Sequence, residues 1–188
     1  MDNRAALLKC ALELFAARGY DAVGVQEIVE AAGVTKPTLY HYFGNKQGLL
    51  QSLLAEPFRE LTQEIRQAAE YHGDLPKNLT QLVQVYFRFA RLNPTAYRLL
   101  LSLWFAPQES EAYQLSESLN SQHYELVGEL FLRAEEAHGN MRGRHQVYAA
   151  SFIGMINTYI GLWLNRYVEL KDELVYQAVH QFEHGIYS

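Results

Sequence analysis

The sequence contains one cysteine, Cys10, among its 188 residues. A single cysteine forms no internal disulfide and no CxxC pair, so we expect a reducing compartment. Cys10 falls within a helical pattern, which favours a small core residue over a redox sensor. The sequence also lacks a nucleophile elbow and a phosphate-binding loop, so an enzyme is not expected, and no cofactor is implied.

Long apolar runs are also missing. No run approaches the roughly 20 residues that span a bilayer, and the N-terminus lacks the apolar segment of a signal peptide. Alternation of apolar and polar residues is not sustained anywhere, so strands are not expected. Hydrophobic residues make up 49% of the chain, which is ordinary for a soluble protein. These observations predict a cytoplasmic, all-α protein.

Helical periodicity covers the chain, and its five prolines all fall at predicted helix starts or breaks. The first helix is expected from about residue 3 to 18, where Gly19 ends it. A long helix is expected from 46 to about 72, and Pro57 should kink or divide it. His138-Gly139-Asn140 is the clearest loop of the second half. The remaining helices are expected over 75–91, 94–105, 109–137, 143–167 and 171–183, and the total is about nine.

Residues 25–46, VQEIVEAAGVTKPTLYHYFGNK, predict two short helices joined by a tight turn. Val25, Ile28, Val29 and Ala32 recur with helical spacing. Gly33 supplies the positive φ that commonly ends a helix. The second helix is expected to start at Thr35 as its N-cap, with Pro37 in its first turn. It should turn Leu39 and Phe43 toward the core.

The other side of this second helix is polar and aromatic. Lys36, Pro37, Thr38 and His41 point outward, and Tyr40 and Tyr42 flank them. A surface helix without a function rarely displays such a set, although packing against the first helix remains an alternative for Tyr40. The pattern predicts a helix-turn-helix whose second helix contacts DNA.

The stretches LFAARGYDAVGV and EIVEAAGVTKPTLYHYFGNKQGLL resemble the N-terminal domain of TetR-family (tetracycline-repressor-like) transcriptional regulators. The resemblance covers about the first quarter of the chain. It departs from the family pattern at Gly24, where a serine or threonine usually caps the second helix. The resemblance implies a three-helix DNA-binding domain at 1–45 and a helical-bundle domain at 46–188. The second domain would bind a small-molecule inducer and form a homodimer that releases a palindromic operator.

We expect DNA contacts of two kinds. Lys36 and Thr38 would approach base edges, with Pro37 in apolar contact. Phosphates would be contacted by Thr35, Tyr40, His41, Tyr42 and Lys46, with a further backbone contact from Gln26. The net charge is −5, yet the first fifty residues hold five cations and five acids. Affinity for DNA should therefore depend on two subunits acting together.

The segment YAASFIGMINTYIGLWL, residues 148–164, is apolar nearly all round and must be covered on more than one side. Gly154, Thr158 and Gly161 lie near one face, where small residues allow another helix to approach. The last predicted helix offers Leu174, Ala178 and Phe182 as a complement. A seam within one chain explains this pattern, but we favour a homodimer interface built as a four-helix bundle.

Aromatic residues make up 13% of the chain and concentrate between residues 86 and 163. Each one taken alone is explained by core packing, whereas together they can frame an apolar ligand pocket with a few polar groups. The residues expected to line such a pocket are Tyr86, Phe89, Trp104, Phe131, Phe152, Asn157 and Tyr159.

Histidines give no convincing metal site. His180 and His184 share one helical face, but HQFEH lacks the glutamate placement of a zinc-binding helix, so we expect no metal. His72, His123, His138 and His145 are expected at the surface. The sequence thus favours a ligand-responsive regulator that binds a double-stranded DNA operator and not a membrane. The alternative is a helical small-molecule or protein-binding module whose helix-turn-helix is only structural.

Overall fold

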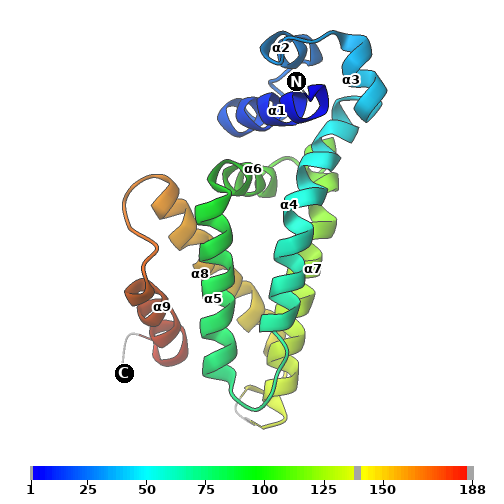
Figure 1. The fold of residues 1–188 in the computed structure, drawn as a ribbon. Helices are drawn as coiled ribbons and strands as arrows, with labels where there is room; N and C mark the ends of the chain where they lie inside the picture. The colour runs from blue at the N-terminus through cyan, green and yellow to red at the C-terminus, as the bar shows by residue number, and fades with distance from the viewer. Residues whose placement is uncertain (1, 138–140, 186–188) are drawn as a thin grey trace. The chain divides into compact units, whose positions relative to one another are not determined.

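The computed structural model describes residues 2–137 and 141–185, and in these ranges the chain forms α-helices and no strand, as Figure 1 shows. The all-α prediction is confirmed, while the loop predicted at His138-Gly139-Asn140 lies outside the described residues. The described helices are α1 (Asn3–Arg18), α2 (Val25–Ala31), α3 (Lys36–Phe43), α4 (Lys46–Ala68), α5 (Leu75–Leu92), α6 (Pro94–Trp104), α7 (Glu111–Glu135), α8 (His145–Leu164) and α9 (Asp172–His184).

The structure tests two predictions about helix α4. The helix runs through Pro57 without a break, so the predicted division is wrong, while the alternative of a kink stays a prediction. Buried leucines and Phe58 surround the proline, and this packing outweighs the one backbone hydrogen bond that proline removes. The helix also ends at Ala68, earlier than expected. The buried Asn78 side chain donates to the carbonyls of Ala68 and Glu70 at 2.7 and 3.0 Å, which satisfies the helix end.

The chain separates into two compact units. The first comprises residues 1–59 and 93–119, and the second comprises residues 60–92 and 120–188. Helix α6 and the start of α7 therefore group with the first three helices. The predicted DNA-binding domain at 1–45 and the predicted ligand-binding and dimerisation domain at 46–188 divide the chain by function and not by compactness. This boundary stays a prediction.

In the first unit α1 is the central element and packs against α2, α3 and α6, as seen in Figure 1. Its inward face supplies Leu7, Ala11 and Phe15, none of which is exposed. Leu39 of α3 and Tyr97 of α6 are equally buried. This core holds α3 in a fixed position while leaving its opposite face free.

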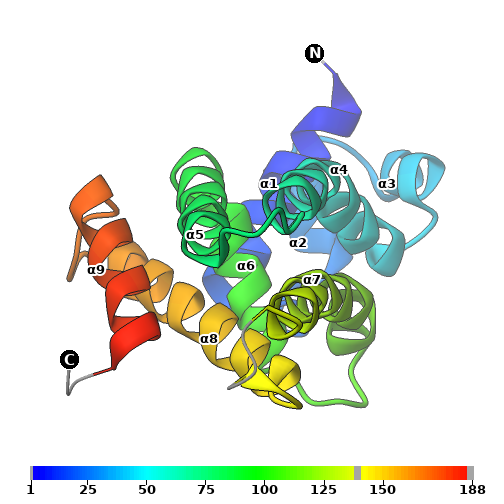
Figure 2. The ribbon, with the colours of Figure 1, turned by 90° about the horizontal axis from the view of Figure 1, so that it is seen from below.

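In the second unit α5 packs against α8 and α9, and Figure 2 shows these three helices side by side. Aromatic rings fill part of the core. Phe152 lies 4.9 Å from Phe182 and 6.2 Å from Phe131, measured between ring centroids. The guanidinium of Arg91 donates to the backbone carbonyl of Leu170, which ties the end of α5 to the segment before α9.

Helix α8 is long and apolar enough to cross a membrane, with a mean hydropathy of 1.4 over its best window. This corrects the expectation that no apolar run approaches that length. A single such helix is weak evidence of a membrane span, because core helices have the same composition. Only 28% of that window is buried. An apolar helix thus keeps much of its surface uncovered within the described chain.

Candidate nucleic-acid interface and effector site

The turn between α2 and α3 is built as its sequence predicts. Gly33 has a φ of +66°, and the N–H of Val34 donates to the Val29 carbonyl at 2.9 Å, which closes the end of α2. Thr35 has the extended backbone of an N-cap, and Pro37 lies in the first turn of α3. Leu39 has no exposed surface and anchors the helix to the core.

The outward face of α3 carries Lys36, Pro37 and His41, all exposed. Tyr40 and Tyr42 are 47% and 42% exposed, so neither is a core residue, and packing of the covered part of Tyr40 stays an alternative to a DNA contact. Helix α3 contains no acid. A convex face with a cation, a titratable imidazole and two phenols can donate to phosphate oxygens and reach base edges.

Three predicted contact residues form hydrogen bonds within the chain. The Thr35 and Thr38 hydroxyls lie 3.0 Å apart, so one hydroxyl donates a hydrogen bond to the other. Each hydroxyl can still form a further hydrogen bond. Gln26 is exposed, but its amide donates to the Glu30 carboxylate. Their DNA contacts stay predictions.

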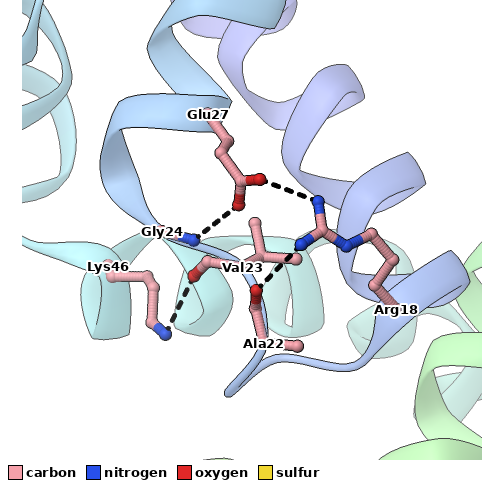
Figure 3. A network of polar contacts seen from close by, with 6 residues as sticks. All are labelled: Arg18, Ala22, Val23, Gly24, Glu27 and Lys46. Carbon is pink, nitrogen blue, oxygen red and sulfur yellow. Dashed lines mark hydrogen bonds and ion pairs between the residues drawn. The ribbon is translucent and has the colours of Figure 1, made fainter.

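Lys46 points into the protein and not toward the face of α3. Its ammonium donates to the carbonyls of Tyr20 and Val23 at 3.1 and 3.2 Å, and it lies 4.0 Å from the centre of the Tyr20 ring. Figure 3 shows the contact with Val23. These partners use two of its three donors, so its first role is to hold the α1–α2 loop. Its predicted phosphate contact is not tested by this geometry.

Sequence reasoning missed the ion pair that completes this loop. Arg18 donates to the Glu27 carboxylate at 2.8 Å and to the Ala22 carbonyl at 3.2 Å, as Figure 3 shows. The hydrogen bond from Arg18 holds the pKa of Glu27 below its usual value. Glu27 also accepts from the N–H of Gly24 at 3.1 Å.

The Glu27 contact replaces the helix cap that Gly24 lacks. In the capping box, an acidic side chain at the third helical position binds the N-cap backbone N–H. Glu27 stands at that position of α2. Its spacing from Gly24 is the signal in the sequence that would have revealed this contact.

Residues 7–53 match the family model described as bacterial regulatory proteins, tetR family. The matched range contains the whole α2–turn–α3 element, Gly33 and the exposed face of α3. This segment is therefore a TetR-type DNA-binding domain. Among the curated relatives of the chain is the HTH-type transcriptional activator FasR of Mycolicibacterium smegmatis. It is 28% identical over 186 residues, which cover 98% of this chain and 82% of the relative.

Solved structures show the same fold over nearly the whole length. The fatty acid degradation regulator FadR from Bacillus halodurans aligns with a TM-score of 0.78 and 22% identity, covering 97% of this chain and 98% of that one. FadR from Bacillus subtilis, in complex with stearoyl-CoA, aligns with a TM-score of 0.78 and 18% identity, covering 97% and 99%. At these identities the likeness establishes the TetR fold alone.

Six of the seven predicted effector residues lie in the second unit. Tyr86, Phe89, Phe131 and Phe152 are buried there, and Asn157 and Tyr159 are half-buried on α8. The Tyr159 hydroxyl donates to Gln181 at 3.3 Å. Trp104, at the end of α6, belongs to the first unit, so the structure groups it separately from the other six. The assignment of these residues to an effector site stays a prediction.

The expectation that His123 lies at the surface was wrong, because only 4% of it is exposed. Its Nε2 atom lies 2.9 Å from the Thr62 hydroxyl, and its ring meets the Tyr86 ring edge-on at 5.9 Å. Burial lowers the pKa of His123 to about 4, so the imidazole is neutral near pH 7. We call Thr62, Tyr86 and His123 the buried polar cluster. In the sequence His123 falls on a polar face of α7, so the pattern did not indicate that this cluster is buried.

Some of the residues predicted for the dimer interface are exposed, whereas others are buried within the chain. Gly154 and Thr158 of α8 are exposed, and Gly161 is half-buried. Ala178 of α9 has no exposed surface, so its place in an interface is corrected to the seam within the chain. The Phe182 ring meets the Phe152 ring edge-to-face in that seam, and Leu174 is half-buried. The seam and an interface therefore use different faces of these helices.

The exposed face of α9 carries Tyr176, which is 68% exposed, together with His180 and His184. The two imidazole rings lie 4.6 Å apart, as their spacing predicts. Within the described residues, no three histidine, cysteine or acidic side chains gather in a way that suits a metal ion.

Proposed function

We propose that this chain is a cytoplasmic, homodimeric and ligand-responsive regulator that binds a two-fold DNA operator through α3. The observation that carries the proposal is the exposed face of α3, where Lys36, Tyr40 and Tyr42 stand outward from a helix anchored by the buried Leu39. Lys36 reads base edges with Thr38, and Tyr40, His41 and Tyr42 bind phosphates.

Two independent properties support the proposed homodimer. The first fifty residues carry as many acids as cations, so one subunit contributes little counterion release and two are needed for affinity. Helix α8 leaves Val147, Gly154 and Thr158 exposed on one face although the helix is apolar. This face of α8 and the exposed Tyr176 of α9 form the interface with a second copy.

The effector is a small molecule bound in the second unit. Ligand binding favours one spacing between the two α3 helices of the dimer. An operator with a fixed half-site separation binds only one spacing, so a ligand that favours a different spacing releases the DNA. We propose a repressor that its effector releases. The curated relative FasR is named an activator, so whether this chain represses or activates transcription has to be tested as well. The stearoyl-CoA in the Bacillus subtilis FadR complex supports a ligand with a large apolar part.

A gel shift with the DNA that flanks the coding region tests the proposal. The wild-type chain should retard one fragment, and Lys36→Ala should both weaken binding and relax sequence preference. Lys77→Ala is the matched control, because Lys77 is an exposed lysine of α5 in the second unit. Absence of a retarded fragment would instead favour the alternative of a helical binding module whose helix-turn-helix is only structural.

The interface is tested by Gly154→Arg. Gly154 is exposed, and a Cβ atom there would meet no atom of the chain within 4 Å, so we expect this substitution to leave the subunit folded. Sedimentation should give a dimer for the wild type and a monomer for Gly154→Arg. Gln122→Arg, at an exposed position of α7, should remain dimeric. A wild-type monomer at micromolar concentration would contradict the proposed assembly.

A further inference from the structure

The hydroxyl of Tyr86 lies in the core of the second unit with no hydrogen-bond partner among the described residues. Only 2% of this residue is exposed. Burying a hydroxyl without a partner costs on the order of 1–3 kcal/mol, so such groups are rare unless something else binds them. Tyr86 stands edge-on to His123, whose Nε2 atom is engaged with Thr62. The buried polar cluster thus offers one open hydrogen-bonding position.

A cleft of about 470 Å³ lies between α7 and α8 in the same unit, which is within the size range of small-molecule sites. Tyr124, Leu132 and Ala149 give it apolar walls. Its lining also contains His145, whose buried Nδ1 atom has no hydrogen-bond partner in the described chain but lies 3.9 Å from the Glu135 carboxylate. A second polar position, next to this carboxylate, therefore lies along the cleft.

Tyr124 connects the cleft to the buried polar cluster. It lines the cleft and directly follows His123 in α7, and the His123 ring meets the Tyr86 ring edge-on at 5.9 Å. Burial and then the neighbouring Tyr124 raise the pKa of Tyr86, so its hydroxyl stays protonated and can donate.

The charges around these groups restrict what can bind. Burial alone accounts for the low pKa of His123, and no charged side chain contributes to the shift at Tyr86. A carboxylate or phosphate placed there would lose its hydration without gaining a cation. The lining of the cleft carries Glu125, which repels an anionic headgroup, and Glu129, whose carboxylate is paired with Arg133 at 3.2 Å.

We propose that Tyr86 is the polar anchor of the effector, and that it donates a hydrogen bond to an uncharged carbonyl of a ligand whose apolar part occupies the α7–α8 cleft. Thr62 and His123 position the Tyr86 ring. The class of ligand is an ester, amide or similar neutral carbonyl compound with a hydrocarbon tail. This assignment rests on the proposed ligand-responsive function and adds the chemistry of the ligand to it.

Thermal shift and tryptophan fluorescence titrations of the full chain test the assignment. The probes are methyl hexanoate, methyl decanoate and methyl tetradecanoate, compared with decanoate, decyltrimethylammonium and stearoyl-CoA. At least one methyl ester should bind, and methyl decanoate should bind more tightly than decanoate or decyltrimethylammonium. Tighter binding of an anionic or cationic probe, or no binding of any ester, overturns the proposal.

Tyr86→Phe gives the sharper measurement because it removes only the hydroxyl. Ester affinity should fall by about 3- to 10-fold, the worth of one hydrogen bond. Stability without ligand should stay equal or rise, since an unpartnered group has been removed. Tyr176→Phe, an exposed tyrosine of α9, should change neither quantity. Equal ester affinity in Tyr86→Phe and wild type overturns the anchoring role.

Operator binding, measured in parallel by gel shift, separates this proposal from the proposed function. Tyr86→Phe should bind operator DNA as the wild type does but require more ester for release. A chain that binds esters through Tyr86 and retards no DNA refutes the regulator and keeps the anchor. A chain that retards DNA but binds no ester keeps the regulator and refutes the anchor.

Discussion

The Tyr20 hydroxyl donates a 2.8 Å hydrogen bond to the Glu111 carboxylate, although the two residues are 91 positions apart in the sequence. Tyr20 lies in the loop between α1 and α2, and Glu111 is the first residue of α7. Both belong to the first unit. Burial and the Glu111 hydrogen bond raise the pKa of Tyr20 well above its ordinary value. The loop that supports α2 is thus joined directly to the start of α7.

Loss of this hydrogen bond should destabilise the chain. Tyr20→Phe is expected to lower the free energy of unfolding by about 1 kcal/mol, because Tyr20 is buried while Glu111 is exposed. Urea unfolding of Tyr20→Phe, Glu111→Ala and the double variant measures the coupling. Glu109→Ala is the control, as Glu109 is an exposed acid two residues away. A coupling energy of zero would show that the pair contributes nothing.

Lys36 and Lys46 should behave differently when each is replaced by methionine. Lys36 is exposed on α3, so Lys36→Met should leave stability unchanged, weaken operator binding and reduce the salt slope by about 1 per subunit. Lys46 holds two loop carbonyls, so Lys46→Met should cost about 1–2 kcal/mol of stability. Thermal unfolding and binding at several salt concentrations distinguish the two. Equal stability of the two variants contradicts the supporting role of Lys46.

Gly48, in the first turn of α4, should tolerate no side chain. A Cβ atom there would stand 2.1 Å from the carbonyl oxygen of Phe43, a backbone atom at the end of α3. Gly48→Ala should therefore cost about 1–3 kcal/mol and displace α3, with a loss of operator affinity. Gly128→Ala is the control, since its Cβ meets no atom within 4 Å and it lies inside α7. Similar melting temperatures for the two variants would contradict the clash.

Acid should destabilise the chain through His123. Its pKa is about 4 in the folded chain and near 6.5 when unfolded, so below pH 6.5 the unfolded state binds more protons. The contribution of the neutral imidazole to the free energy of unfolding is fully present above pH 6.5. It is lost as the pH falls toward 4, by on the order of 3 kcal/mol. Unfolding in urea between pH 7 and 4 measures the slope.

His123→Gln keeps a partner for Thr62 and should flatten this pH dependence. His180→Gln is the matched control, because His180 is exposed on α9 and its replacement should leave the slope unchanged. The same slope in His123→Gln and wild type would place the acid sensitivity elsewhere.

The helix-turn-helix could be predicted from sequence because its determinants are local. Gly33 supplies the positive φ after α2, Thr35 has the extended backbone of the α3 N-cap, and Leu39 turns toward the core at helical spacing, all within seven residues. Such turn and cap preferences depend on the geometry of the neighbouring backbone, so they can be predicted without knowledge of the remaining chain. The set of outward side chains on α3 followed from the same local periodicity.

The roles of Lys46, His123 and Ala178 depended instead on segments far away in the sequence. Lys46 finds its partners more than 20 residues earlier, and His123 meets Thr62 across 61 residues. Ala178 faces the seam because α9 packs on α5 and α8. Helical periodicity says which residues share a face, whereas only the packing of other helices says which face is covered. Local sequence therefore established how this chain presents α3, and long-range packing established what supports it and where an effector can be held.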